Sequence, residues 1–94
     1  LYVLEAGNHR ISKFDAVNGT FLGWKGRVAS VPTGGGTACT TLSVGDVTPT
    51  WCTGGSAAAS WKLGGFDTPT SLSGDGFYLY VFDSRNNRVQ AVPR

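Results

Sequence analysis

The sequence predicts an all-β fold, and three observations support that prediction. Glycine makes up 14 of the 94 residues, about twice its usual share, which disfavours long helices and suits strands joined by turns. No stretch shows sustained helical periodicity with capping residues. A motif at the start of the chain returns near its end, which indicates a repeating β unit. A chain of this length forms at most one small domain.

Strands are expected first in the N-terminal part of the chain. Three short segments there have the apolar or alternating patterns of strands: residues 1–5, 10–15 and 20–24. In the second of them, Ile11 and Lys13 fall on one face, and Ser12 and Phe14 fall on the other. Turn residues separate the strands at 6–9 and 16–19. The second turn contains Asn18-Gly19, a dipeptide typical of hairpins.

The C-terminal part of the chain shows the same kind of pattern. Three further strands are expected there: residues 68–73, 77–83 and 88–92. Pro69 lies near the start of its strand, where a missing hydrogen-bond donor is tolerated. Gly74-Asp75-Gly76 predicts a tight turn between the first two of these strands.

The two ends of the chain carry the same motif. Residues 1–11 align with residues 79–89, an offset of 78 positions. Leu, Tyr, Val, Asn and Arg are identical in the two copies, and most of the other positions are conservative exchanges. A repeat this long indicates an array of which the chain holds little more than one unit. We therefore expect an excerpt or a processed product of something longer.

Cys39 and Cys52 are the only cysteines, and we expect them to form a disulfide. They lie within residues 31–60, a segment rich in Gly, Thr, Ser, Ala and Pro that buries little apolar area of its own. Cross-linking a loop of about 15 residues contributes ~3 kcal/mol in the chain-entropy model. A zinc site, which would need Cys-x-x-Cys spacing or companion histidines, and a buried free pair are the alternatives. A disulfide implies an oxidising compartment: the extracellular space, the bacterial periplasm or the cell surface.

The repeated motif resembles the core of an NHL repeat. Its residues are Leu-Tyr-Val, an acidic and a small residue, and then Asn-x-Arg followed by Ile11 or Val89. The sequence Asn-Gly-Thr-Phe-Leu-Gly-Trp after the first copy is similar to the outer end of such a repeat. Residues 66–72, Phe-Asp-Thr-Pro-Thr-Ser-Leu, are similar to its lead-in. This family forms β-propellers, in which each blade is a four-stranded antiparallel sheet.

The resemblance implies that the chain holds two partial blades. Residues 1–27 correspond to strands two to four of one blade, and residues 66–94 to strands one to three of the next. Residues 28–65 are then an irregular, disulfide-clamped insertion, similar to that of bacterial long-repeat NHL proteins in which a Cys pair recurs in each blade. The chain departs from the family at Ser71, where Gly is usual, and in its repeat, which is nearly twice the ordinary length of about 40 residues.

Two partial blades do not make a stable propeller. Unpaired strand edges are not stable alone, and a propeller needs about four to eight blades. The ring is therefore expected to close either by head-to-tail assembly of several chains or within a longer chain. The expected partners are other copies of this chain or flanking repeats.

Paired Asn and Arg residues occur in both copies of the motif: Asn8, Arg10, Asn86 and Arg88. They are candidate ligand contacts, but a blade-building role fits their appearance in both copies better. An Asn at a turn accepts left-handed backbone geometry. An Arg beside Glu5 or Asp83 is expected to bridge blades through a bidentate pair.

Other candidate ligand residues are aromatic or titratable. Trp24, Trp51 and Trp61 could form a surface on which a sugar stacks, or Trp24 could fill the packing between blades while Trp51 shields the disulfide. His9 is the only histidine, and several copies of it could converge on one face of an assembled ring. Asn18 begins an N-glycosylation sequon, although the same residues also predict a hairpin turn.

Composition excludes several classes of function. A net charge of +2 without clustered basic residues argues against nucleic-acid binding, and no apolar run approaches the ~18 residues of a membrane span. No catalytic triad, phosphate-binding loop or dinucleotide fingerprint is present, so neither catalytic residues nor a cofactor or metal site is expected. The first hypothesis is a non-catalytic, exported scaffold for protein or glycan binding or for self-assembly. The alternative, implied by the resemblance, is a fragment of a metal-dependent propeller enzyme of the lyase or lactonase kind, to which this chain would offer His9 and Glu5.

Overall fold

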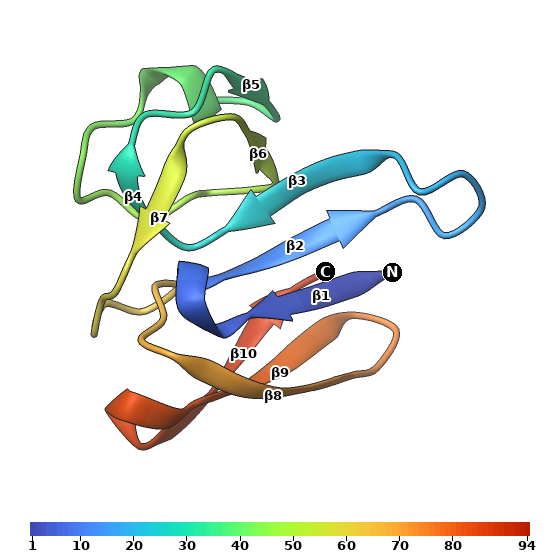
Figure 1. Ribbon diagram of the computed structural model, residues 1–94, viewed down its shortest axis with the longest axis vertical. Coiled ribbons are helices and arrows are strands. Elements are labelled where there is room, and N and C mark those ends of the chain that lie inside the picture. Colours follow the sequence, from blue (N-terminus) through green and yellow to red (C-terminus); the bar gives the residue numbers. More distant parts are fainter.

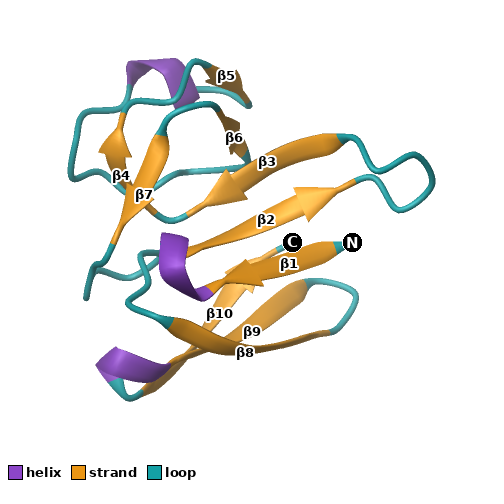
Figure 2. Ribbon diagram, in the orientation of Figure 1, coloured by secondary structure: helices purple, strands orange, loops and turns teal.

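The computed structural model describes residues 1–94, and antiparallel strands dominate it (Figure 2). The strands are β1 (Tyr2–Glu5), β2 (Arg10–Phe14), β3 (Phe21–Lys25), β4 (Arg27–Ser30), β5 (Gly34–Gly35), β6 (Cys52–Thr53), β7 (Ser56–Ala58), β8 (Pro69–Gly74), β9 (Tyr78–Asp83) and β10 (Arg88–Pro93). The helices are three single turns of 3-10 type: η1 (Ala6–Asn8), η2 (Cys39–Thr41) and η3 (Ser84–Asn86). The all-β prediction is confirmed. None of these helices has the length or apolar character required to cross a membrane.

The strands form three antiparallel sheets. The first has the order β1-β2-β3-β6-β5, the second has the order β10-β9-β8, and the third is the ribbon β4-β7. The first two sheets face one another, and the two chain termini lie side by side (Figure 1). Arg94 Nε lies 3.3 Å from the Tyr2 hydroxyl, which joins the two ends directly.

The repeat in the sequence is also a repeat in the structure. We call β1 and β2 with their turn the first hairpin (residues 1–14), and β9 and β10 with their turn the second hairpin (residues 79–92). Both have the same register, with an acid opposite an arginine at the turn end: Glu5 opposite Arg10, and Asp83 opposite Arg88. Both turns contain a 3-10 helix and end on a residue in the left-handed region.

The insertion is less irregular than the sequence predicts. Its residues 52–53 form β6, which pairs with β3, and β5 pairs with β6, so the first sheet extends beyond its third strand. The segments on either side of this extension form the ribbon β4-β7. The chain turns at Gly26, where a Cβ atom would lie 3.0 Å from the His9 carbonyl oxygen, and continues directly into β4. Short pairings to an existing sheet edge therefore order a segment that has little strand propensity of its own.

The expected disulfide is confirmed. Cys39 and Cys52 are bonded, with their Cα atoms 5.5 Å apart, and both side chains are fully buried. The bond ties η2 to β6, and β6 in turn pairs with β3 through Trp24 and Cys52. The disulfide therefore attaches the insertion to the outer edge of the first sheet.

The hydrophobic core lies between the first and second sheets. Its fully or nearly fully buried members are Ile11, Phe66, Leu79, Val81 and Val92. Partly buried side chains pack around them: Tyr2, Leu4, Trp51 and Leu72. Only 20 of the 94 residues are buried, so this one interface supplies most of the apolar packing between the two hairpins.

Candidate functional site

Each hairpin presents two chemically different faces, because side chains alternate along a strand. One face carries the acid and is here called the carboxylate face. In the first hairpin its members are Leu1, Val3, Glu5, Arg10, Ser12 and Phe14, and in the second they are Leu79, Val81, Asp83, Arg88, Gln90 and Val92. The other is here called the tyrosine face. Its members are Tyr2, Leu4 and Ile11 in the first hairpin and Tyr80, Phe82 and Val89 in the second.

Unlike faces meet inside the molecule. The tyrosine face of the first hairpin packs against the carboxylate face of the second, with Ile11 and Val81 both fully buried. The two remaining faces are open. Their equivalent residues are exposed, with Val89 at 66% and Val3 at 40% of their full accessible surface. The two hairpins therefore share a sequence motif but bury opposite sides of it.

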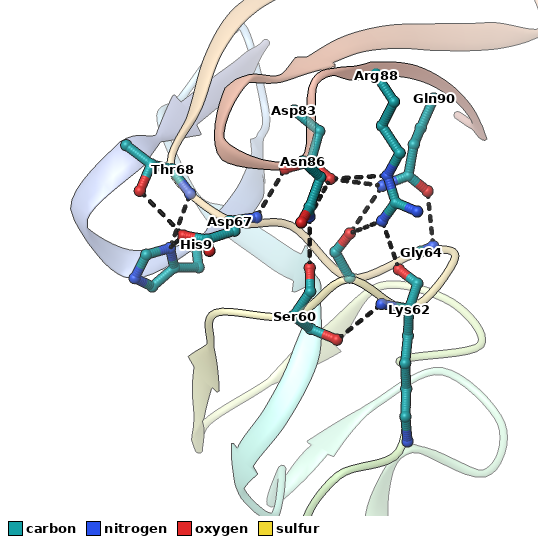
Figure 3. A network of polar contacts seen from close by, with 11 residues as sticks. His9, Ser60, Lys62, Gly64, Asp67, Thr68, Asp83, Asn86, Arg88 and Gln90 are labelled. Carbon is teal, nitrogen blue, oxygen red and sulfur yellow. Dashed lines mark hydrogen bonds and ion pairs between the residues drawn. The ribbon is translucent and has the colours of Figure 1, made fainter.

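The second carboxylate face centres on a fully buried acid, Asp83 (Figure 3). Its Oδ2 accepts hydrogen bonds from Asn86 Nδ2 at 2.8 Å, Arg88 Nε at 3.0 Å and Gln90 Nε2 at 3.3 Å. Its Oδ1 accepts the backbone N–H of Asp67 at 2.7 Å. A buried carboxylate is tolerated because it has both a cationic partner and several donors.

The residues around Asp83 also hold the backbone of the segment before β8 (Figure 3). Arg88 Nη2 donates to the Lys62 carbonyl at 2.9 Å. Gln90 donates to the Gly65 carbonyl at 2.7 Å and accepts the Gly64 N–H at 2.8 Å. These bonds satisfy the backbone N–H and C=O groups of an irregular segment. Without them, those groups would be unpaired where the segment packs against the sheet.

The first carboxylate face contains the matching acid in a more open setting. Arg10 donates two hydrogen bonds to Glu5, from Nε to Oε2 at 2.9 Å and from Nη2 to Oε1 at 3.2 Å. Asn8 Nδ2 donates at 2.9 Å, and the Ser12 hydroxyl donates as well. Burial alone would raise the pKa of Glu5, but the bonds from Arg10, Ser12 and Asn8 lower it to about 2. Glu5 is therefore ionised at neutral pH.

The four predicted Asn and Arg residues lie in these clusters, with two corrections. The left-handed residues are His9, at φ 53°, and Asn87, at φ 50°, instead of Asn8 and Asn86. The Asn8 and Asn86 side chains bind the acids instead. Neither arginine reaches an acid of the other hairpin, because each pairs within its own hairpin at the turn.

Ser12 and Gln90 were not identified from the sequence as members of these clusters. The signal was available, since the 78-residue offset aligns them directly after the matched Ile11 and Val89. Ser and Gln are dissimilar in size, and an alignment judged by identity stops before them. Both can donate a hydrogen bond, and both do so to the acid of their own copy.

His9 joins the first hairpin to the segment before β8. Its Nδ1 accepts the backbone N–H of Thr68 at 3.0 Å and lies 3.8 Å from the Asp67 carboxylate. Thr68 has a left-handed backbone, φ 50°, which a β-branched residue rarely adopts. In this chain His9 thus acts as a structural contact between two segments.

The three tryptophans do not form one exposed surface. Trp24 is buried, and its Nε1 donates to the Gly54 carbonyl at 2.8 Å. Trp51 is half-buried, with its ring centroid 5.7 Å from that of Tyr2 and 4.9 Å from Lys25 Nζ. Trp61 is 77% exposed. Of the three, only Trp61 offers most of its ring to a partner.

A cavity of about 480 Å³ lies where β3 meets the end of β10. Lys25 lines it, donates to the Pro93 carbonyl at 2.7 Å and is nearly buried. Burial and then the charge of Lys13 lower the pKa of Lys25. The cavity is lined by apolar and uncharged residues apart from Lys25 and Arg88, and no group of three or more His, Cys, Asp or Glu residues gathers anywhere in the structure.

Asn18 lies in an exposed turn, as its hairpin interpretation predicts. Its Oδ1 accepts the Thr20 N–H at 2.9 Å, and the Asp15 carboxylate accepts the N–H groups of Val17 and Asn18. These two backbone bonds lower the pKa of Asp15. Glycosylation at this sequon stays a prediction.

Comparisons with protein-family models, curated proteins and solved structures found no match to this chain. The internal repeat allows the two hairpins of this chain to be compared with each other. Each hairpin shows what the same motif does in a different environment, and the packed interface between them shows which surfaces fit together.

Proposed function

We propose that this chain is a non-catalytic, exported repeat scaffold whose units stack face to face in an NHL-type β-propeller. The ring closes through several chains or within a longer chain. The sequence resemblance supports this proposal, and so do two antiparallel sheets that pack against each other. In this interpretation β1-β2-β3 and β8-β9-β10 are parts of neighbouring blades.

The observation that carries the proposal is the unequal use of the two faces. The chain buries one tyrosine face against one carboxylate face and leaves one of each exposed. The exposed apolar members are Leu1, Val3, Tyr80, Phe82 and Val89. Exposed apolar clusters of this kind on a soluble protein mark interaction sites. The partner that fits them is the one already present inside the molecule, a face of the opposite kind.

Repeating this contact gives a head-to-tail arrangement. The two contacting surfaces are different, so the interface is heterologous, and such interfaces generate either closed rings or open filaments. Closure removes both exposed faces at once and buries apolar surface, which stabilises by about 25 cal/mol per Å². A ring of blades is therefore favoured over an open chain of units.

Export and partner binding form the less direct part of the proposal. The Cys39–Cys52 disulfide is compatible with an extracellular location. The insertion projects from the outer edge of the first sheet (Figure 1). Exposed Trp61 follows the last insertion strand, β7. Loops on a rigid scaffold commonly carry recognition, and we assign protein or glycan binding to this region.

The native mass of the assembly tests the proposal. Light scattering on a sizing column should show a discrete multimer of 9.9 kDa subunits. Val89→Arg places a charge in the middle of the exposed tyrosine face and should reduce the multimer to a monomer. Val17→Arg is the matched control, because Val17 is 97% exposed in a turn outside both faces. A folded monomer at every concentration tested would contradict stacking between chains.

A further inference from the structure

The segment before β8 fits into the second hairpin as a plug fits into a socket. We call residues 62–67 the plug, and the part of the second carboxylate face that holds it the second socket. Phe66 of the plug is fully buried in the core beside Val81 and Val92. Asp83, Arg88 and Gln90 bind the backbone of the plug on either side of Phe66.

The socket is specific for backbone shape. It binds four backbone groups: the Lys62 carbonyl, the Gly64 N–H, the Gly65 carbonyl and the Asp67 N–H. Binding therefore depends on the backbone conformation of the plug. Gly64 has φ +83°, a conformation that L side chains rarely adopt. A Cβ on Gly65 would lie 2.8 Å from that of Ser60. The Gly-Gly pair and the phenylalanine are thus the recognisable features of the plug.

The first hairpin has the equivalent residues around an open pocket. The pocket has a volume of about 400 Å³ and is lined by Val3, Glu5, Arg10, Ser12, Phe14 and Phe21. The first five align with Val81, Asp83, Arg88, Gln90 and Val92, the residues that hold the plug in the second hairpin. The position of this pocket therefore corresponds to the place that the plug occupies.

Two polar residues of the first socket, Glu5 and Arg10, are the equivalents of Asp83 and Arg88, which bind the plug backbone. The third, Ser12, stands where Gln90 binds Gly64 and Gly65. Arg88 uses its Nη2 on a plug carbonyl, whereas Arg10 turns the same atom back onto Glu5 Oε1. A partner carbonyl could take that donor, because Glu5 keeps bonds from Arg10 Nε, Asn8 and Ser12. Ser12 is shorter than Gln90 and leaves room at the same position.

A second and independent feature lies beside the pocket. In the second hairpin, β8 follows the plug and pairs with β9. In the first hairpin the strand equivalent to β9 is β1, and it is an edge strand that pairs only with β2. Edge strands accept added strands through their free backbone groups. The pocket and the free edge of β1 are thus next to each other. They correspond to the positions that the plug and β8 occupy in the second hairpin.

We infer that the first socket binds an extended peptide with the sequence pattern of residues 62–72, the lead-in segment of a further repeat unit. The phenylalanine of that peptide fills the pocket, its backbone bonds to Glu5 and Arg10, and its following strand pairs with β1. This inference rests on the proposed stacking of repeats and adds the part of a neighbouring unit that completes the first sheet.

A synthetic peptide tests the inference directly. The probe has the sequence of residues 60–74 and is titrated into the 94-residue chain by calorimetry, with NMR to locate the site. We expect one peptide per chain and backbone shifts confined to the first hairpin and Phe21. A peptide carrying Phe66→Ala should bind about thirtyfold more weakly or worse, as expected for a buried aromatic anchor.

A pair of protein variants localises the binding. Val3→Arg puts a charge into the pocket and should abolish binding, whereas Val17→Arg, at an exposed turn position, should leave the affinity unchanged. Shifts at Asp83 and Gln90 in place of Glu5 and Ser12 would mean that the peptide displaces the internal plug, and would overturn the inference. Absence of binding to the Val89→Arg variant at millimolar peptide would overturn it as well.

The titration is repeated on Val89→Arg, the variant designed to prevent stacking. Val89 lies outside the first socket, so its substitution leaves the pocket residues unchanged. Peptide binding to this variant is therefore measured without self-association. If the Val89→Arg variant binds the peptide and the wild-type chain is also a monomer, the result would support the socket and contradict stacking between chains. A wild-type multimer, together with a monomeric Val89→Arg variant that does not bind the peptide, would support stacking and contradict the socket.

Discussion

The two hairpins are built to one plan and meet different environments. They share strand register, a 3-10 turn and a left-handed residue at the end of that turn. In the second hairpin the carboxylate face is buried under the first hairpin and the plug. In the first hairpin the same face is half open. Asp83 is fully buried, whereas the Glu5 side chain is 24% exposed.

The difference shows how one motif serves two purposes. Within each hairpin, the acid, the asparagine and the arginine fix the turn by local hydrogen bonds. Where another segment packs on top, the same arginine also binds that segment. Local contacts therefore build each hairpin, and only in the second does the arginine also bind a segment that is distant in the sequence. Two experiments on equivalent positions and one on Glu5 alone measure how far this division holds.

The largest difference is expected at the acids. Asp83→Ala removes a fully buried acceptor shared by Arg88, Asn86 and Gln90, and it breaks the ion pair with Arg88. The substitution should cost about 3–5 kcal/mol of unfolding free energy. Glu5→Ala affects a partly solvated cluster and should cost about 1 kcal/mol. Urea unfolding of both variants measures the two losses. Equal losses would show that the first carboxylate face is as buried in solution as the second.

A comparable difference is expected at the equivalent leucines. Leu79 is 3% exposed in the core, and Leu1 is 66% exposed. Leu79→Ala should lower the unfolding free energy by about 2–5 kcal/mol, whereas Leu1→Ala should change it by less than about 0.5 kcal/mol. The comparison is made on dilute protein, below the concentration at which chains associate. A rise in the Leu1→Ala loss with concentration would sharpen the assignment of that face to an interface.

The third experiment concerns the pH dependence that comes from Glu5. Its folded pKa of about 2 lies below the ordinary value of 4.5, so its contribution to stability is fully present above pH 4.5. That contribution is lost as the pH falls from 4.5 toward 2, because the unfolded chain then binds the proton more readily. The stability difference between wild type and Glu5→Gln should therefore shrink over this range. A constant difference across the range would mean that the bonds to Glu5 do not depend on its charge.

Much of the local structure could be predicted from the residues alone. The strands around both copies form close to their expected positions, and the turns at Asn18-Gly19 and Asp75 form through their own side chains. The alternation in β2 is confirmed, since Ile11 and Lys13 lie opposite β1 residues of the tyrosine face. These features depend on neighbours a few residues away, which the sequence states directly.

The insertion was harder to predict, for a physical reason. Its short strands β5 and β6 are only two residues each, and β5 is Gly-Gly, which has little intrinsic preference for extended structure. They are ordered by pairing to the edge of β3 and by the disulfide. The presence of two cysteines indicates the bond, but nothing near them in the sequence names the sheet edge to which they attach.

The sequence by itself determined the all-β class, the repeat, the disulfide and the residues of both carboxylate clusters apart from Ser12 and Gln90. Only the tertiary structure decided which face of each hairpin is buried, and that the plug lies on one socket and not on the other. Five of the eleven aligned residues are identical and most of the others are conservative exchanges, so the local pattern predicts the same hairpin at both ends and does not say which face is covered. Burial is set by the segment that packs opposite, and that segment is far away in the sequence.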